Sequence, residues 1–360
     1  MKNSKKISAL LLGTALVLGG LTACADTDSG NAKSAGSAES TGGTESTGSV
    51  AEQGKETFKK LNIGAAGSDD SVAMEIANLA CNNGYLEEEL NAVGYTANIV
   101  AFQEAGPEIN EALAAGDINA AVYGDFPAFT SKSNGIDTTV VATVNKKQQF
   151  GVLATGDITS AKDLEGKKVI VLTGTTAQYY WEHYVAAYDI DVDAVEIINA
   201  TDATSLLSTG EADAYVMTLP SLVYFEGLGI GNVLDDSTKV EDGHTSYLFE
   251  VASSVLEEDP EVGVAINKAL IRAYEDAVAN PQDLYDAVAS AQIGADCYEA
   301  QYAFDTSLVY LLPEITDESL AYYENLNEWL INHSLISEAV DIDSFFDTSY
   351  YQKAVDELAE

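Results

Sequence analysis

The fold is predicted outward from the stretch Asp163-Leu-Glu-Gly-Lys-Lys-Val-Ile-Val-Leu-Thr-Gly-Thr-Thr-Ala-Gln-Tyr-Tyr-Trp181. Residues 169–172 are apolar and largely β-branched, which predicts a short buried strand. Residues 173–176 include Gly174 and predict a turn, and the composition from residue 177 onward is typical of a helix. The chain is therefore expected to pass from strand to helix through Gly174, Thr175 and Thr176.

The start of this helix is a candidate ligand site. The first N–H groups of a helix have no partner within the helix, and they can hold an anion. One interpretation is that the Thr175 hydroxyl only caps the helix. The other is that the hydroxyls of Thr175 and Thr176 join the free N–H groups in holding a ligand oxygen. Both interpretations stay open on this motif alone.

The amino terminus predicts export. Three lysines precede an apolar run over residues 7–21 that is too short to span a membrane, so residues 1–23 are predicted to be a signal peptide. The run ends in Leu21-Thr22-Ala23-Cys24, which resembles the bacterial lipobox. This resemblance implies that Cys24 is lipidated and becomes the first residue of the mature chain. The alternative is an ordinary signal peptide cleaved nearby.

Residues 24–56 are predicted to be a flexible, lipid-anchored spacer. The segment is rich in Gly, Ser, Thr, Ala and acidic residues, and it has too few large apolar side chains to bury. About 300 residues remain after it, which is more than one compact core usually serves. We therefore expect two lobes.

The charge of the chain is strongly negative. Its formal net charge is −41, and loss of the three lysines of the signal peptide would make it −44. Such a charge repels nucleic acid and anionic lipid, so we expect no nucleic-acid partner. Cys81 and Cys297 lie in apolar, helix-like surroundings, which favours free thiols over a disulfide. Neither has Cys or His neighbours, and we expect no metal or other cofactor.

Strands and helices are predicted to alternate along the chain. Expected strands are residues 61–65, 95–102, 120–123, 169–172, 195–198 and 212–217, with an extended segment at 245–252. Expected helices include 72–81, 108–115 and 203–208, and the chain is mostly helical from residue 260. Strand, crossover and strand units imply largely parallel sheets that are covered on both faces, with ligands at the carboxyl ends of the strands. The order of elements over 113–123 recurs over 206–217, which suggests two matching halves.

These features together resemble the solute-binding component of an ABC importer. The residues that carry the resemblance are the lipobox and spacer, Ala-Ala-Gly-Asp-Ile-Asn-Ala-Ala-Val-Tyr-Gly-Asp-Phe-Pro-Ala at 114–128, Lys-Asp-Leu-Glu-Gly-Lys-Lys-Val at 162–169, and Ser-Thr-Gly-Glu-Ala-Asp-Ala at 208–214. The chain is most similar to the nitrate, sulfonate and thiamine-precursor group, which has the type II periplasmic-binding-protein fold. The similarity covers about residues 61–360, and Asn119 departs from it because Asp is usual there.

The resemblance implies two doubly wound α/β lobes, a two-crossing hinge and a helical C-terminal region. Residues 57–146 and 248–360 would form lobe 1, and residues 147–247 would form lobe 2. The crossings would lie near residues 144–149 and 245–251. The family implies capture of a small solute between the lobes and delivery to an ABC transporter permease by a monomer anchored on the extracytoplasmic face of the cell membrane.

Thirteen residues are expected to bind the solute, because they lie at or soon after the ends of strands that face the cleft. Gly67 and Gly124 could instead serve only turns, Asp125 could be a helix cap, and Tyr179 could be ordinary helix packing. The expected binding residues are Ala66, Gly67, Phe102, Gln103, Tyr123, Gly124, Asp125, Gly174, Thr175, Thr176, Tyr179, Met217 and Thr218.

The solute class is predicted from the same residues. A sulfonate- or nitrate-like anion is favoured by the Gly-Thr-Thr turn. A bidentate Arg clamp is not expected, because the only Arg of the folded region, Arg272, falls in a helical stretch away from the predicted strand ends. The chain contains 19 tyrosines. They suit the alternative of a neutral or aromatic ligand, such as a thiamine pyrimidine precursor stacked on rings.

An enzyme is the alternative of another class. The same fold is used by pyrimidine-precursor synthases and menaquinone-pathway enzymes. The first kind carries a cysteine-rich cluster, which this chain lacks, and His183, His244 and His333 are far apart in sequence. No catalytic residues are therefore predicted, and the chain is expected not to be an enzyme. A third class is a lipid-tethered adhesin or sensor. Such a protein would have the same cellular location and the same spacer but would need no permease.

Overall fold

The computed structural model describes residues 58–68, 71–240 and 243–360. All of them belong to one compact unit, Lys55–Glu360. The predicted signal peptide, Cys24 and the spacer at 24–56 lie outside the described residues. Within the described part of the chain, no helix has the length and apolar character needed to cross a membrane.

The first sheet combines parallel and antiparallel strands. β1 runs parallel to β3 and β4, whereas β11 lies antiparallel between β4 and β5. The order is β2-β1-β4-β11-β5, with β3 also paired to β1. The strands are β1 (Lys59–Ser68), β2 (Ser71–Ala73), β3 (Tyr95–Phe102), β4 (Ala120–Gly124), β5 (Thr138–Gln148) and β11 (Thr245–Ala252).

The second sheet is also mixed. β7 is parallel to β8 and β9, while β6 is antiparallel to both β9 and β10. The order is β10-β6-β9-β7-β8. The strands are β6 (Phe150–Ala154), β7 (Lys168–Ile170), β8 (Glu196–Ile198), β9 (Ala214–Thr218) and β10 (Asn232–Asp236).

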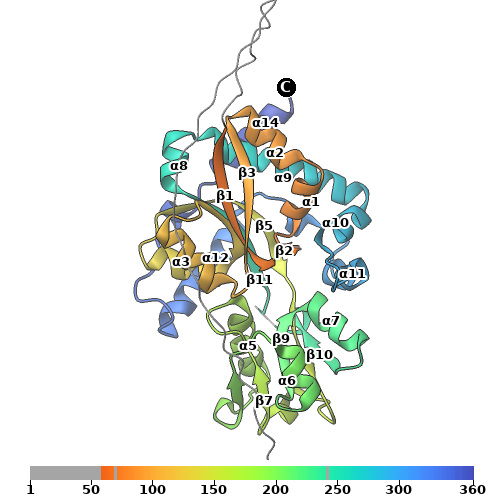
Figure 1. The fold of residues 1–360 in the computed structure, drawn as a ribbon. Helices are drawn as coiled ribbons and strands as arrows, with labels where there is room; N and C mark the ends of the chain where they lie inside the picture. The colour runs from red at the N-terminus through yellow and green to blue at the C-terminus, as the bar shows by residue number, and fades with distance from the viewer. Residues whose placement is uncertain (1–57, 69–70, 241–242) are drawn as a thin grey trace, which may run out of the picture. The chain divides into compact units, whose positions relative to one another are not determined.

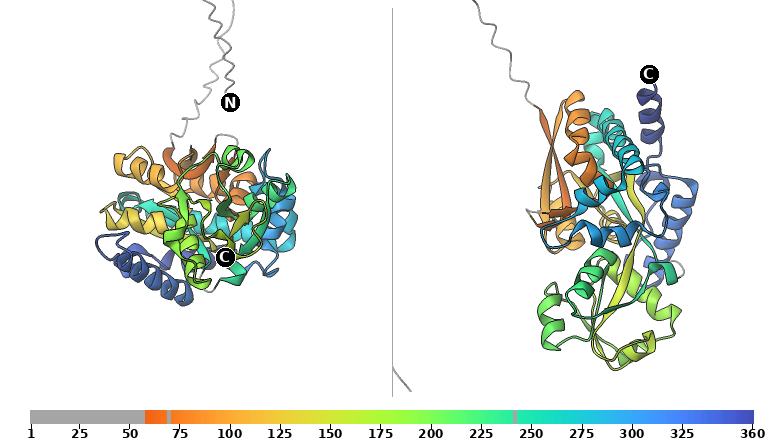
Figure 2. Two further views of the ribbon diagram at one scale, coloured as in Figure 1. Left: turned by 90° about the horizontal axis from the view of Figure 1, so that it is seen from below. Right: turned by 90° about the vertical axis from the view of Figure 1, so that its right-hand side faces the viewer.

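The chain crosses between the two sheets twice. The first crossing is a single residue, Gln149, between β5 and β6. The second lies between the end of β10 at Asp236 and the start of β11 at Thr245, and so precedes the predicted crossing at 245–251. Two α/β sheets with two crossings confirm the predicted fold class. The right-hand view of Figure 2 shows the green second-sheet part separate from segments of both chain ends, which gather around the first sheet.

Helices cover both faces of the first sheet. Those on one face are seen together in Figure 1, and the bounds of that set are α1 (Ile76–Asn82), α2 (Tyr85–Ala92), α9 (Glu261–Ala279), α10 (Pro281–Val288) and α14 (Ser349–Leu358). The other face packs against α3 (Gly106–Ala115), α4 (Asp125–Ser133), α12 (Asp317–Asn332) and α13 (Ile342–Phe345). Two short helices, α8 (Ser253–Glu258) and α11 (Ala295–Tyr302), complete this part.

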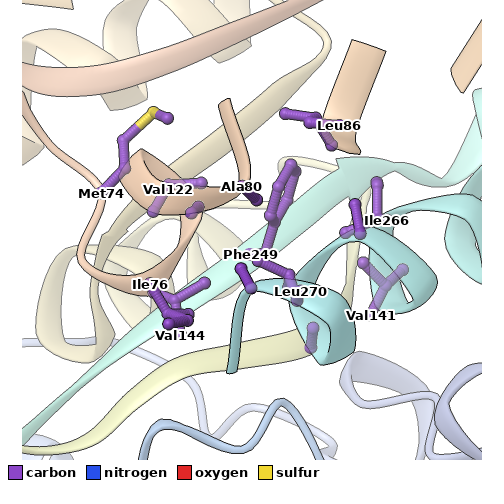
Figure 3. Close-up of a cluster of buried hydrophobic side chains, with 14 of the residues drawn as sticks. Met74, Ile76, Ala80, Leu86, Val122, Val141, Val144, Phe249, Ile266 and Leu270 are labelled. Carbon is purple, nitrogen blue, oxygen red and sulfur yellow. The ribbon is translucent and has the colours of Figure 1, made fainter. Parts of the chain in front are cut away.

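The core of the first sheet follows the two-residue period of its strands. Along β4, Val122 faces the α9 side, while Tyr123 faces the α12 side. Along β11, Phe249 and Leu248 divide in the same way. Figure 3 shows Phe249 among Val141, Ile266 and Leu270, where it is fully buried. The strands are therefore apolar on both faces, as expected for a sheet that helices cover twice.

The second sheet is covered by three helices: α5 (Thr176–Ala187), α6 (Ala203–Thr209) and α7 (Leu219–Gly227). Tyr180, Trp181 and Tyr184 of α5 are buried against one face of the sheet. Leu207 of α6 and Leu222 of α7 cover the other. Short 3₁₀ helices lie at Ala161–Leu164, Val192–Ala194, Ser237–Lys239 and Val309–Leu311.

Two expectations about secondary structure were wrong. Residues 72–81 were predicted to be one helix, but Ser71–Ala73 pairs with β1 as β2 and the helix begins only at Ile76. The sheets were predicted to be largely parallel, but both are mixed, because a strand that returns across the hinge enters its sheet in the reverse direction. The expectation of free thiols agrees with the structure, in which Cys81 and Cys297 are unpaired.

Glu250 of β11 is a charged residue in the middle of the first sheet. It is fully buried, and its carboxyl group accepts hydrogen bonds from the Tyr123 hydroxyl at 2.7 Å and the Thr138 hydroxyl at 3.3 Å. Burial raises the pKa of Glu250 from 4.5 to about 7, although these hydrogen bonds and the charge of Lys132 act in the opposite direction.

This pKa predicts a pH dependence of stability. A folded-state pKa above the unfolded value means that the folded chain holds the proton more tightly, so the contribution of Glu250 is largest below pH 4.5 and is lost as the pH rises toward about 7. Relative to Glu250→Gln, the wild type should lose up to about 3 kcal/mol of unfolding free energy over this window. Urea unfolding of both proteins at pH 4.5 and pH 8 measures the difference. Parallel pH profiles would contradict the assignment.

Candidate functional site

A cavity of about 330 Å³ lies where strands of both sheets end. The first sheet contributes Ala66 and Gly67 at the end of β1 and Tyr247 near the start of β11. The second contributes Phe150 at the start of β6 and Met217 near the end of β9. Because β11 and β6 run antiparallel to their neighbours, their starts lie at the same edge as the ends of β1 and β9. The cavity therefore occupies the place at which ligands bind to open α/β sheets.

The turn before α5 brings backbone N–H groups to this cavity. The N–H of Thr173 donates to the Asn199 side chain at 3.2 Å, and the N–H of Gly174 donates to the Gln178 side chain at 2.9 Å. Among the described residues, the N–H groups of Thr175 and Thr176 have no hydrogen-bond partner. Both residues line the cavity. The positive end of the α5 dipole and two free donors therefore lie beside it.

The Thr175 hydroxyl is already engaged. It accepts a hydrogen bond from the Ala177 N–H at 3.2 Å and donates one to the Leu172 carbonyl at 2.7 Å. Thr175 is thus the N-cap of α5, as one interpretation of the sequence expected. The Thr175 hydroxyl therefore has no proton left to donate to a ligand, and of the other interpretation there remain the backbone N–H groups of Thr175 and Thr176 and the Thr176 hydroxyl.

Aromatic side chains form much of the remaining lining. Tyr215 of β9, Tyr247 of β11 and Tyr298 of α11 join Phe150 around the cavity. Burial raises the pKa of Tyr215 to about 12 and raises the pKa values of Tyr247 and Tyr298 as well. The three phenols therefore stay protonated and can donate hydrogen bonds while their rings supply apolar surface.

A second group of polar side chains lies at the start of α7. The hydroxyls of Thr218 and Ser221 are 3.1 Å apart, and both residues line the cavity. Gln103 and Ser71 line the side formed by the first sheet. Among the described lining residues there is no Lys, Arg, His, Asp or Glu. Recognition by this lining would rest on hydroxyls, amides and helix dipoles.

Seven of the thirteen predicted binding residues line the cavity. Gly67 also has a plain structural role, because its φ of +143° and the Ser71 carbonyl, 2.2 Å from where a Cβ would lie, require glycine where the end of β1 pairs with β2. The seven are Ala66, Gly67, Gln103, Thr175, Thr176, Met217 and Thr218.

Asp125 and Tyr123 do not line the cavity. Asp125 is fully buried and accepts hydrogen bonds from the N–H groups of Phe126 and Ser246 and from the Tyr322 hydroxyl. Burial raises its pKa to about 6, against the effect of these hydrogen bonds. Tyr123 is buried with its hydroxyl on Glu250. Both side chains serve the interior of the first sheet.

The remaining four predicted binding residues are also absent from the lining of the cavity. Phe102 packs against the α12 side of the first sheet. Gly174 turns the chain before α5 with a φ of +75°. Gly124 precedes α4 and contacts Thr176, and Tyr179 is buried among residues that cover the first sheet. The expectation that ligands bind at strand ends, called the strand-end rule below, therefore found the right region. The direction of each side chain determined which of the predicted residues reach the cavity.

Several lining residues were missed. Tyr298 and Ile293 come from the C-terminal helical region, which no strand-end rule could connect to the cleft. Tyr247 follows the second crossing, and its place in the sheet could have been found only by predicting β11 as an antiparallel strand. Ser221 belongs to the first turn of α7, and the Thr218-Leu-Pro sequence before it was a usable signal.

Within the described residues, no group of three or more His, Cys, Asp or Glu side chains is placed to hold a metal ion. A buried carboxyl group lies behind the aromatic wall instead. Glu75 accepts hydrogen bonds from the Tyr302 hydroxyl at 2.6 Å and the Asn145 amide at 3.3 Å. Glu75 is buried, which raises the pKa of its carboxyl group, and it does not line the cavity. This group is therefore part of the interior and not a ligand of the cavity.

Comparison with protein families gives one match. The family model described as NMT1/THI5 like matches residues 79–284, which is more than half of the chain. The matched segment includes β3 to β11, and with them most of the strands that border the cavity. No match was found among curated proteins.

Solved structures with the same fold include binding proteins and an enzyme. A putative sulfonate-binding periplasmic protein of an ABC transporter, SsuA from Methylobacillus flagellatus KT, has a TM-score of 0.70 at 19% identity over 84% of this chain and 96% of that one. The periplasmic nitrate-binding protein NrtA from Synechocystis PCC 6803 has a TM-score of 0.65 at 12% identity, over 84% and 89%. The desulfurization enzyme DSZB has a TM-score of 0.63 at 15% identity, over 83% and 99%. At these identities the likeness concerns the fold.

Proposed function

The chain belongs to the NMT1/THI5-like family, and on that premise we propose that it is the extracytoplasmic solute-binding component of an ABC importer. It captures a small solute between the two sheets and delivers it to a membrane permease. The observation that carries the proposal is the cavity of about 330 Å³, which strand ends of both sheets and the free N–H groups of Thr175 and Thr176 border. The sulfonate- and nitrate-binding proteins of the same fold support it.

The favoured solute is an organic anion of the sulfonate kind. Two free N–H groups at the start of a twelve-residue helix can accept an oxyanion without a basic side chain. Nitrate would fill little of the cavity, whereas Phe150, Tyr215, Tyr247 and Tyr298 offer apolar surface to an organic group. Because the chain carries a net charge of −41, an anion has to be held by such local dipoles against the overall field.

A neutral aromatic solute is the second candidate. It is favoured by one observation, the lack of any basic side chain among the described lining residues. Three protonated phenols, Gln103 and the hydroxyls of Thr218 and Ser221 could hydrogen-bond a heterocycle such as a thiamine pyrimidine precursor. Stacking on the phenol rings would provide the remaining affinity.

Binding without catalysis is proposed for this site. A hydrolytic or group-transfer site needs a nucleophile or an acid–base pair within hydrogen-bond distance of the substrate. The described lining consists of hydroxyl, amide, aromatic and apolar groups. No His or Cys stands among them to activate a hydroxyl, which supports a binding protein over an enzyme like the desulfurization enzyme of the same fold.

The proposed cellular location is the extracytoplasmic face of the cell membrane. It rests on the predicted signal peptide 1–23, lipidation of Cys24 and the spacer 24–56, all from the sequence. The proposed lobes are the parts built on the first and on the second sheet, which the sequence predicted as residues 57–146 with 248–360 and residues 147–247; the end of β5 at Gln148 and the start of β11 at Thr245 move these bounds by two or three residues. They would close on the solute as hinged bodies, and the closed monomer would be the form that the permease binds.

Thermal unfolding of the full chain tests the function. The panel contains butanesulfonate, benzenesulfonate, nitrate and an aminopyrimidine of similar size to benzenesulfonate. A solute at 100 times its Kd should add about 2.7 kcal/mol to the free energy of unfolding and should be recovered unchanged. Benzenesulfonate is expected to give the largest increase in Tm and nitrate the smallest. No increase with any member, or conversion of a member to product, would contradict the proposal.

The joint replacement of Thr175 and Thr176 by alanine tests the anion site. The change removes a helix cap, so the variant alone should lose about 1 kcal/mol of stability. The increase in Tm caused by benzenesulfonate, compared within the variant, should fall to a small fraction of the wild-type increase, because the first turn of α5 is no longer held in place. Thr316→Ala removes the N-cap of α12 and is the matched control, in which the increase should persist. An undiminished increase in the double variant would rule out this end of the cavity as the anion site.

A further inference from the structure

Helix α5 contacts the first sheet's half of the protein as well as its own sheet. Tyr180, Trp181 and Tyr184 pack on the second sheet. Tyr179 instead lies in the cluster that covers the first sheet, where it is 3% exposed. Its ring is 4.9 Å from the ring of Trp329 in α12, in an edge-on arrangement. The helix therefore joins the two halves of the protein through side chains as well as through the chain crossings.

The same side of α5 meets Gly124, at the end of β4. A Cβ at Gly124 would lie 2.4 Å from Cγ2 of Thr176, 3.2 Å from its Oγ1 and 3.4 Å from its Cβ. Carbon atoms in van der Waals contact are about 3.5–4.0 Å apart. The three nearest atoms all belong to Thr176, so the closest obstruction to a side chain comes from the opposite half of the protein.

The backbone of Gly124 would itself accept a side chain. Its φ of −68° and ψ of 152° are extended values that any residue can adopt. Thr176 has little freedom to move aside, because it is β-branched, 5% exposed and the first residue of α5. The backbone at position 124 would thus accept an alanine, and the tightest conflict of its methyl group would be with the first residue of α5.

We infer that Gly124 is a positioning residue for closure of the cleft, and that Thr176 on Gly124, together with Tyr179 on Trp329, forms a clasp between the two halves. Thr176 also lines the cavity, so the clasp fixes where the free N–H groups of α5 stand relative to the first sheet. An added methyl group would force the helix start back by more than about 1 Å, which is enough to misplace those donors. The inference rests on the proposed function only in treating the cavity as a solute site.

Tryptophan fluorescence can follow the clasp without a bound solute. The chain has two tryptophans, Trp181 and Trp329. Trp181→Phe leaves Trp329 as the single reporter, and Tyr179 and His183 of α5 shield it. Acrylamide quenching of Trp329 is measured in the full chain of this background, with and without benzenesulfonate, and the melting temperature of each variant confirms that it is folded.

Four variants separate the clasp from general damage. One of the two conditions, with or without benzenesulfonate, should leave Trp329 of the parent protein protected from acrylamide. In that condition, Gly124→Ala should increase the quenching constant of Trp329 several-fold. It should also weaken benzenesulfonate binding at least 10-fold. Adding Thr176→Ser, which removes Cγ2 but keeps the hydroxyl, should restore protection, whereas adding Thr176→Val should not. Gly227→Ala is the matched control, because a Cβ there meets no atom within 4 Å.

The outcomes are distinct. Equal protection of Trp329 from acrylamide in the parent and in Gly124→Ala would overturn the inference. So would a failure of the added Thr176→Ser to restore this protection. Free quenching of Trp329 in the parent under every condition would overturn it as well. Failure of the proposed solute class is seen separately, as no rise in Tm with any member of the panel. In that case the quenching results still decide whether the clasp exists.

Discussion

Asp125→Ala is expected to lower the free energy of unfolding by about 3–5 kcal/mol, because each buried donor that loses its acceptor costs about 1–3 kcal/mol. The side chain is fully buried and accepts hydrogen bonds at 2.7 Å from the Phe126 N–H, 2.8 Å from the Ser246 N–H and 2.7 Å from the Tyr322 hydroxyl. Alanine would leave the buried N–H groups of Phe126 and Ser246 without an acceptor, and the Tyr322 hydroxyl with only the His244 carbonyl at 3.4 Å.

The measurement is urea unfolding at pH 4.5, because a folded-state pKa of about 6 means that the contribution of Asp125 is lost as the pH rises through 6. Asp125→Asn should cost less, because one oxygen is retained. The increase in Tm caused by benzenesulfonate should be unchanged in Asp125→Ala, since Asp125 does not line the cavity. A stable Asp125→Ala variant that fails to respond to the solute would show instead that Asp125 contacts it.

Ser221→Trp is expected to weaken solute binding by at least 100-fold. Ser221 is in the first turn of α7, partly exposed, and lines the cavity. An indole placed there would compete with the solute for a volume of about 330 Å³, which is at the lower end for small-molecule sites. The stabilisation of about 2.7 kcal/mol at 100 times the wild-type Kd should then fall below about 0.5 kcal/mol.

Thermal unfolding with benzenesulfonate measures this loss. Ser205→Trp is the matched control, because Ser205 lies in the first turn of α6 and is exposed outside the cavity. It should retain the full stabilisation. Equal responses of the two tryptophan variants would mean that the solute binds somewhere else.

The strands and the region of the site could be predicted from the sequence because their signals are local. The apolar run before Gly174 placed β7 to within two residues, and the residues predicted at 95–102 are the ones that form β3. Capping of α5 by Thr175 was one of the two interpretations of the Gly-Thr-Thr turn, and the structure confirms it. These features depend on hydrophobic pattern and capping chemistry within a few residues.

The rest depends on contacts that are distant in sequence. Asp125 and Tyr123 follow or end a strand at the cleft edge, yet their partners Ser246, Tyr322 and Glu250 come from segments more than a hundred residues away. A strand-end rule cannot tell whether a side chain turns into the cavity or into the interior.

Tyr298 is the opposite case, a residue that lines the cavity although the sequence did not predict it. It lines the cavity from α11, in a helical region whose sequence carries no sign of a cleft. Tyr179 was expected to be a wall of the site because it follows the Gly-Thr-Thr turn. Helical geometry places it on the side of α5 that contacts Trp329.

The central claim is that a small solute is held between the two sheets, at the start of α5. A crystal structure of the full chain, grown with the panel member that raises the Tm most, tests it directly. With benzenesulfonate, we expect sulfonate oxygens within about 3.2 Å of the Thr175 and Thr176 nitrogens and the ring among Tyr215, Tyr247 and Tyr298. A solute bound outside this cavity, or no solute in it at a concentration that stabilises the protein, would contradict the claim.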